Sequence, residues 1–292
     1  MSATQDTVNG DLAQPTEISH RGFSASVLID GMPTPIYQPE YDSHTGDLLE
    51  ELPSKRIRTC WIPSLEGKNF SVAFQNDEGE DAEHASCAHI FVDGKDVASA
   101  IMRPGRVKPA VRHGAKVSPS VIKPFTFSRI RLTDDDDIAD PNDPRAKDIG
   151  TIRVEIKFIR TGKIVPIKAC DPEDIGLIHE KAKKASIHTT TYKTTKRIDR
   201  GRSVSTAPLY PNDAWEHHVV FIFRYRSADF LMAEGIMLRP TLPAEEGNGG
   251  TPTPEASRSE PERPGKRPLE HEDKGNTRRP LFHPGSATPP NG

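Results

Sequence analysis

The chain has 292 residues, of which 34% are hydrophobic, and it contains 27 prolines and 21 glycines. Globular chains are typically about 45 to 50% apolar on a scale that also counts glycine, so part of this chain is expected not to pack into a core. The formal net charge of -3 excludes both a polycation built for nucleic acid and a strongly acidic solvating polymer.

Nothing in the sequence indicates export or membrane insertion. Residues 1–16 contain no apolar run, and no stretch approaches the ~20 apolar residues that cross a bilayer. Cys60, Cys87 and Cys170 are far apart and odd in number, which does not suit a disulfide framework. Free thiols in an unexported chain favour a reducing compartment. We therefore expect an intracellular protein, cytoplasmic or nuclear, with no membrane partner.

Two polar ends flank the part of the chain with strand patterning. Residues 1–18 are polar and rich in small residues, which predicts a disordered leader. Residues 241–292 predict a disordered tail rich in proline and glycine. They bury too little apolar surface to offset a chain entropy of ~1 to 2 kcal/mol per ordered residue. Residues 19–240 are predicted to form one β-rich domain.

The first predicted strand covers residues 22–29, where Phe23, Ala25, Val27 and Ile29 share one face. It ends at Asp30-Gly31, a dipeptide suited to tight hairpins because both residues tolerate positive φ. Two more strands are predicted over residues 56–62 and 69–75.

The same pattern returns at residues 88–92, followed by Asp93-Gly94 and a strand over residues 95–102. Two units of strand, Asp-Gly and strand predict antiparallel pairing. A further strand is predicted over residues 125–132. The clearest one covers residues 151–160, and a turn at Thr161-Gly162 is expected to lead into residues 163–168.

Two helices are predicted in the last part of the domain. Residues 171–186 carry proline in the opening turn, acidic residues early and lysines late, as the helix dipole favours. After a strand over residues 217–226, residues 227–234 begin with Ser227 as an N-cap and end at Gly235. The pattern predicts an all-β, mainly antiparallel sandwich or barrel-like domain with two short peripheral helices and disordered termini.

The ordered set of segments resembles a family of uncharacterised proteins from mushroom-forming fungi that share a domain of unknown function. The resemblance implies a shared fold and variable tails, and it carries over no catalytic residue. The segments are GFSASVLIDG at 22–31, TCWIPSLEGKNFSV at 59–72, HIFVDGKDV at 89–97, KPFTFSRIRLTDDD at 123–136, IGTIRVEIKFIRTG at 149–162 and FRYRSADFLMAEGIM at 223–237.

Possible metal and catalytic sites each lack required residues. His84, Cys87 and His89 have no second ligand cluster, and we expect a buried strand cysteine between loop-edge histidines. The aspartates at 134–137 lack the spacing of a calcium loop and predict a solvated loop. Cys60 is expected to be a small core residue. With no nucleophile elbow and no phosphate-binding loop, we expect no enzymatic activity, no metal and no cofactor.

Basic side chains are concentrated in two segments. Residues 101–131 hold eight basic and no acidic residues, and residues 177–204 hold eight basic residues with Glu180 and Asp199. If the two segments meet on one face, they would attract phosphate backbones or acidic proteins, whereas scattered residues would simply be solvated. The candidate binding residues are Arg103, Arg106, Lys108, Arg112, Lys116, Lys181, Lys183, Lys184, Lys196, Arg197, Arg200 and Arg202.

Two functions remain open at this point. Charge in loops on a well-patterned β domain favours a non-enzymatic interaction module with a protein partner. The alternative is a nucleic-acid or chromatin-associated protein that uses the basic segments 101–131 and 177–204. The scarcity of aromatic residues among these basic residues argues against a stacking platform for single strands.

Overall fold

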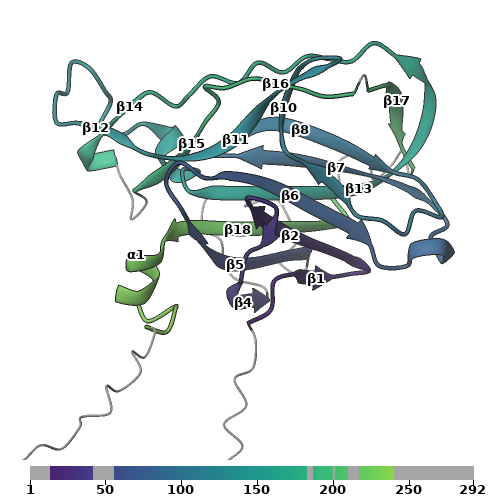
Figure 1. The fold of residues 1–292 in the computed structure, drawn as a ribbon, viewed down its shortest axis with the longest axis horizontal. Coiled ribbons are helices and arrows are strands. Elements are labelled where there is room, and N and C mark those ends of the chain that lie inside the picture. Colours follow the sequence, from purple (N-terminus) through teal and green to yellow (C-terminus); the bar gives the residue numbers. More distant parts are fainter. Residues whose placement is uncertain (1–13, 42–55, 183–186, 200, 210–216, 240–292) are drawn as a thin grey trace, which may run out of the picture. The chain divides into compact units, whose positions relative to one another are not determined.

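A computed structural model of the chain describes residues 14–41, 56–182, 187–199, 201–209 and 217–239. Over these residues two β-sheets pack face to face and do not close into a barrel (Figure 1). The predicted all-β, mainly antiparallel sandwich is therefore confirmed. Most of the predicted leader and the whole predicted tail lie outside the described residues, so their disorder stays a prediction.

The first sheet of the described chain has nine strands. They are β1 (Ile18–His20), β2 (Phe23–Ile29), β3 (Met32–Pro33), β6 (Asn69–Asn76), β9 (Ala110–Arg112), β10 (Gly114–Ser118), β11 (Val121–Arg129), β15 (His188–Thr191) and β16 (Lys196–Arg197). The main order is β1-β2-β6-β11-β10. Beside this path, β3 pairs with β2, β9 pairs with β6, and both β15 and β16 pair with β11.

The second sheet has seven strands. They are β4 (Tyr37–Tyr41), β5 (Ile57–Ser64), β7 (Ala85–Val92), β8 (Lys95–Met102), β13 (Thr151–Val165), β17 (Ser203–Pro208) and β18 (Val219–Ser227). Their order is β4-β5-β18-β13-β7-β8, with β17 beside β13. The pair β5–β18 is parallel, whereas β13 runs antiparallel to β7, β17 and β18.

The core lies between the sheets because alternate residues of each strand point inward. Phe23 and Val27 of β2 and Val72 of β6 come from the first sheet, and Val154 of β13 and Phe223 of β18 come from the second. All five belong to one buried cluster. Alternation of period two therefore places the apolar half of each strand in the shared core, as the sequence predicts.

The two predicted hairpins at Asp-Gly dipeptides are confirmed. Asp30 and Gly31 have φ of 48° and 86°, and Asp93 and Gly94 have 49° and 80°. The first turn joins β2 to β3 and the second joins β7 to β8, both antiparallel. Two successive positive φ values match the right-handed twist of the flanking strands.

The predicted helix over residues 171–186 is wrong for the described residues 171–182. Leu177–His179 forms β14, a parallel partner of β12 (Arg131–Thr133), and a 3-10 turn, η5 (Glu180–Ala182), follows. Gly176 interrupts any helix with a φ of 86°. Ile175 and Ile178 are buried in a small cluster with Ile130, Ala146 and Ile149. Burial against these distant residues therefore overrides the local helical pattern.

The turn predicted at Thr161-Gly162 is also wrong, because β13 continues through it to Val165. Strand β17 supplies pairing partners along this extension, from Ile159↔Pro208 to Val165↔Ser203. Gly162 lies where the register of the two strands shifts, between the pairs Thr161↔Thr206 and Ile164↔Val204. The glycine therefore accommodates an irregularity within the strand pair rather than a turn.

The second predicted helix is confirmed as α1 (Ala228–Ala233), which follows β18 directly (Figure 1). Ser227 caps it, because its Oγ accepts a hydrogen bond from the Phe230 N–H at 3.3 Å. Gly235, with a φ of 67°, ends the helix. Two further 3-10 turns are η3 (Gly79–Asp81) and η4 (Pro144–Lys147).

Candidate functional site: a cleft in the first sheet

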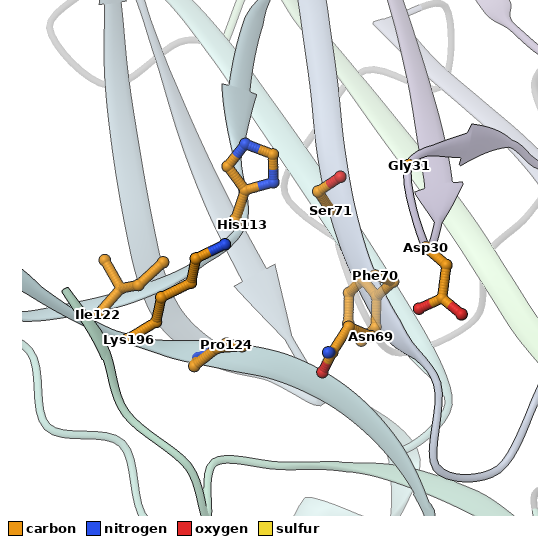
Figure 2. A pocket seen from close by; sticks show the side chains of 9 residues that line it. All are labelled: Asp30, Gly31, Asn69, Phe70, Ser71, His113, Ile122, Pro124 and Lys196. Carbon is orange, nitrogen blue, oxygen red and sulfur yellow. The ribbon is translucent and has the colours of Figure 1, made fainter. Parts of the chain in front are cut away.

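The candidate site is a cleft of about 290 Å³ at the point where β6 changes its partner. Asn69 and Phe70 of β6 pair with β11, whereas the residues from Val72 onward pair with β9. Ser71 falls between the two pairings. His113 occupies the corresponding step between β9 and β10. The lining residues are Asp30, Gly31, Asn69, Phe70, Ser71, His113, Ile122, Pro124 and Lys196 (Figure 2).

The two ends of the cleft carry different chemistry. At one end the amino group of Lys196 points toward the imidazole of His113, beside the apolar Ile122 and Pro124 (Figure 2). Asp30 lies at the other end, and residues of β6 lie between the two ends. A ligand in the cleft would therefore meet a cationic end and a carboxylate end.

Close packing of β10 on β11 holds His113 at the cleft. A Cβ on Gly114 would lie 2.2 Å from the carbonyl oxygen of Lys123 and 2.8 Å from Cα of Pro124. Only glycine allows this approach, since backbone atoms cannot move aside like a flexible side chain. The His113 carbonyl in turn accepts a hydrogen bond from the Phe125 N–H at 3.2 Å. The backbone on both sides of the imidazole is therefore fixed.

The cationic end gathers positive charge from segments far apart in the sequence. Burial lowers the pKa of His113, and the nearby charges of Lys196 and Arg112 lower it further. Burial also lowers the pKa of Lys116, with a second contribution from Arg112. Burial lowers the pKa of Arg112 as well, and the charge of Arg106 lowers it further. Lys196 and Arg112 therefore lie near the neutral imidazole of His113, and Arg112 also lies near Lys116 and Arg106.

The carboxylate end is held by its own contacts. Asp30 pairs with Lys68 at 2.9 Å, and this hydrogen bond lowers the pKa of the carboxyl. The Asp30 N–H donates to the carbonyl of Asn69 at 2.9 Å. The Asn69 side-chain oxygen accepts a hydrogen bond from Thr126 Oγ1 at 2.8 Å. Both polar residues are therefore positioned before any ligand arrives.

The structure brings together only some of the predicted binding residues. Lys196 from the second basic segment lines the cleft, and Arg112 from the first lies near His113, with Arg106 and Lys116 near Arg112. Lys181 lies elsewhere, beside Asp136 at 3.5 Å. Arg103, Lys108, Arg197 and Arg202 are exposed and do not line the cleft, and Lys183, Lys184 and Arg200 lie outside the described residues.

Arg106 and Arg112 are oriented by backbone carbonyls. Arg106 donates from Nε to the Lys108 carbonyl at 2.8 Å, and Arg112 donates from Nε to the Ser99 carbonyl at 2.8 Å. The Arg112 contact joins β9 to β8, the last strand in the order of the second sheet. Arg112 therefore lies where an edge of the second sheet approaches the first.

The residues considered as metal ligands do not converge. His84 lies 3.8 Å from Glu83, whereas His89 contacts Asp96 at 3.4 Å. In the aspartate run, Asp135 Oδ1 accepts a hydrogen bond from the Asp137 N–H at 2.9 Å, so it organises its own loop. Within the described ranges, no group of three or more His, Cys, Asp and Glu side chains is arranged to hold a metal ion.

Sequence reasoning missed Asp30, Asn69, Ser71 and His113 as parts of one site. Three of them look like ordinary turn or strand residues, and no local pattern joins them. His113 carried a usable signal, because it stands between Arg112 and Gly114 in a basic segment.

The part of the chain that the structure describes contains no helix long and apolar enough to cross a bilayer.

One of the comparisons with known proteins found a match. No curated protein and no solved structure matches the chain. Residues 22–240 match the family described as Domain of unknown function (DUF7918), which covers most of the chain and nearly all of its two sheets. The chain therefore belongs to the DUF7918 family.

Proposed function

We propose that the domain is a non-enzymatic protein-interaction module that binds an acidic, extended segment of a partner protein in the cleft of the first sheet. One observation carries the proposal. Lys196 and His113, from distant parts of the chain, meet at one end of the cleft, with Arg112 close enough to lower the pKa of His113. Such convergence attracts an anion more strongly than scattered surface charges do.

The size of the cleft favours a side chain over a cofactor. Small-molecule sites typically measure about 300 to 1,000 Å³, and this cleft, at about 290 Å³, lies at the lower limit. One or two side chains of an extended segment would fill it. An acidic side chain would meet Lys196, and a hydrogen-bond donor on a neighbouring residue would meet Asp30. The pairing at both ends would fix the direction of the segment.

A nucleic acid is the alternative partner, and the nearby Arg106, Arg112 and Lys116 are what favour it. Two features argue against it. The carboxylate of Asp30 would repel a phosphate backbone. Phe70, the phenylalanine that lines the cleft, is 2% exposed and offers no face for base stacking.

The proposal also includes an origin in a mushroom-forming fungus and an intracellular location, cytoplasmic or nuclear.

Lys196→Gln is expected to weaken the binding of an acidic peptide by about 3- to 10-fold, since one exposed ion pair contributes about 1 kcal/mol. The probe is a fluorescent peptide of alternating glutamate and serine, followed by anisotropy at low salt. Lys181→Gln is the matched control. It removes the same charge beside Asp136, and it should leave the affinity unchanged.

Several outcomes would contradict the proposal. Equal losses in Lys196→Gln and Lys181→Gln would mean that binding follows net charge rather than the cleft. Equal affinity for a peptide with glutamine at every glutamate position would exclude recognition of acidic groups. Tighter binding to a nucleic-acid duplex than to the peptide at physiological salt would favour the alternative partner.

The affinity for the acidic peptide is expected to rise as the pH falls from 7.5 to about 5.5. Burial and the charges of Lys196 and Arg112 lower the pKa of His113, so the imidazole is neutral at pH 7 and becomes a further cation in acid. His113→Asn should abolish this rise while keeping most of the affinity at pH 7.5. An identical pH profile in His113→Asn would show that another group is responsible.

A further inference from the structure

A second cluster of reactive groups lies in the second sheet, at residues that the proposed function does not use. Cys87 and His89 belong to β7, two residues apart, so they share the face opposite the inward-facing Ala88 and Ile90. In β8, Asp96 lies next to this pair, with its Oδ2 at 3.4 Å from Nδ1 of His89. Cysteine, histidine and aspartate therefore meet across two neighbouring strands.

His89 holds a positive charge beside the thiol. Its hydrogen bond with Asp96 is the largest cause of the rise of its pKa to about 9, and the Cys87 side chain makes the next contribution. The Cys87 thiol itself donates to the Ala88 carbonyl at 3.9 Å. Glu155, which pairs with His89 across β13, adds a further carboxylate nearby. An imidazolium fixed by a carboxylate is the usual means of stabilising a thiolate in proteins. Arg112 is close enough to interact electrostatically with Cys87 as well.

The other two cysteines lack such a partner. Cys60 is 1% exposed, and burial raises its pKa to about 12 despite Arg58 and Arg224 nearby. Cys170 is only half-buried, and burial together with Asp96 and Asp171 raises its pKa. Both environments favour the unreactive thiol. The chain therefore contains two internal controls for the chemistry of Cys87.

We propose that Cys87 is a peroxide-sensitive thiol that His89 activates. The Cys87 thiolate attacks one oxygen of hydrogen peroxide, the O–O bond breaks, and a sulfenic acid forms on the sulfur. The sulfur loses two electrons and the peroxide gains them. The leaving hydroxide takes the proton of the His89 imidazolium and departs as water. A thiol such as glutathione would reduce the sulfenic acid through a disulfide.

The small exposure of Cys87 points to the size of its reactant. The residue is 5% exposed, whereas the side chain of His89 is 32% exposed above it. A peptide or a larger electrophile would not reach the sulfur, but hydrogen peroxide is hardly larger than water. This distinguishes a site of oxidation from the active site of a cysteine hydrolase, which needs room for its substrate.

The test follows sulfenic acid on each cysteine of the full-length protein. The protein is treated with a low dose of hydrogen peroxide and with dimedone, and mass spectrometry measures the labelling rate of each cysteine peptide. Exposure alone predicts that Cys170 reacts first. Activation by His89 predicts that Cys87 reacts about tenfold faster than Cys170, because an imidazolium beside the sulfur favours the nucleophilic thiolate. Labelling of Cys170 ahead of Cys87 would overturn the proposal.

Variants of the partner residues separate activation from accessibility. His89→Gln should lower the labelling rate of Cys87 about tenfold, and Asp96→Asn should lower it less. His84→Gln is the matched control, because this histidine lies beside Glu83, and it should leave the rate unchanged. The Asp96 side chain is half-exposed, so its variant keeps the test decisive if His89→Gln does not fold. Unchanged Cys87 labelling in a folded His89→Gln or Asp96→Asn protein would refute the role of His89.

Discussion

Replacing Asp93 with asparagine is expected to lower the free energy of unfolding by about 3 kcal/mol. Asp93 lies at the β7–β8 turn and is 6% exposed. Its Oδ1 accepts hydrogen bonds from the Gly150 N–H at 2.8 Å and the Tyr225 hydroxyl at 2.6 Å. Its Oδ2 accepts hydrogen bonds from the Thr190 N–H at 2.9 Å and from Thr189 Oγ1 at 3.0 Å.

The expected loss is large because an amide cannot replace this carboxylate. Each oxygen of Asp93 accepts a backbone N–H, one from Gly150 and one from Thr190. Whichever way the asparagine turns, its NH₂ group would face one of these donors. The partners belong to both sheets, since Thr190 lies in β15 and Tyr225 in β18. Burial raises the pKa of the Asp93 carboxyl, and the hydrogen bonds oppose that rise.

Urea denaturation of Asp93→Asn and of the matched variant Asp30→Asn measures this effect. Both aspartates precede glycine in a hairpin turn and both have a φ near 50°. Asp30, however, is exposed, and its carboxylate pairs with Lys68 at 2.9 Å. Asp30→Asn should therefore leave the free energy of unfolding nearly unchanged. Similar losses in the two variants would mean that the turn conformation matters, and not the buried hydrogen bonds.

Phe70→Ala is expected to lower the free energy of unfolding by about 3 to 5 kcal/mol, the usual loss for a buried phenylalanine. The ring of Phe70 stacks on Phe127 with a centroid distance of 4.3 Å and on Phe125 with 5.3 Å. Phe127 in turn contacts Tyr225 of the second sheet at 5.0 Å. Removing Phe70 would leave a cavity in this aromatic column, which rigid strands cannot fill.

Phe91→Ala is the comparison variant for the same denaturation measurement. Phe91 is half-buried on the outer face of β7, where Arg153 lies 4.4 Å from its ring centroid. Its removal should cost less than half as much, because the site opens toward solvent. An equal loss in both variants would contradict the placement of Phe70 in the core. Phe70→Ala should also weaken binding of the acidic peptide, because Phe70 lines the cleft.

The candidate site was only partly predictable. The concentration of basic residues in two segments was visible in the sequence, and it led to Arg112, Lys116 and Lys196. Their position relative to His113 was not visible, because it depends on how β16 and β9 lie against the β10–β11 hairpin. Lys181 shows why charge alone could not locate the site. It has the same charge as Lys196 and belongs to the same basic segment, yet it lies beside Asp136.

The sequence by itself determined the features that depend on neighbouring residues. The alternation along β2 and β13 decided that the fold is a sheet, and the Asp-Gly dipeptides decided two hairpins, because period and positive φ are local properties. Only the tertiary structure decided features that depend on distant partners. Burial of Ile178 turned an apparent helix into β14, and the pairing with β17 extended β13 through a predicted turn. The cleft and the Asp93 hydrogen bonds belong to this second class, because strands far apart in the sequence form both.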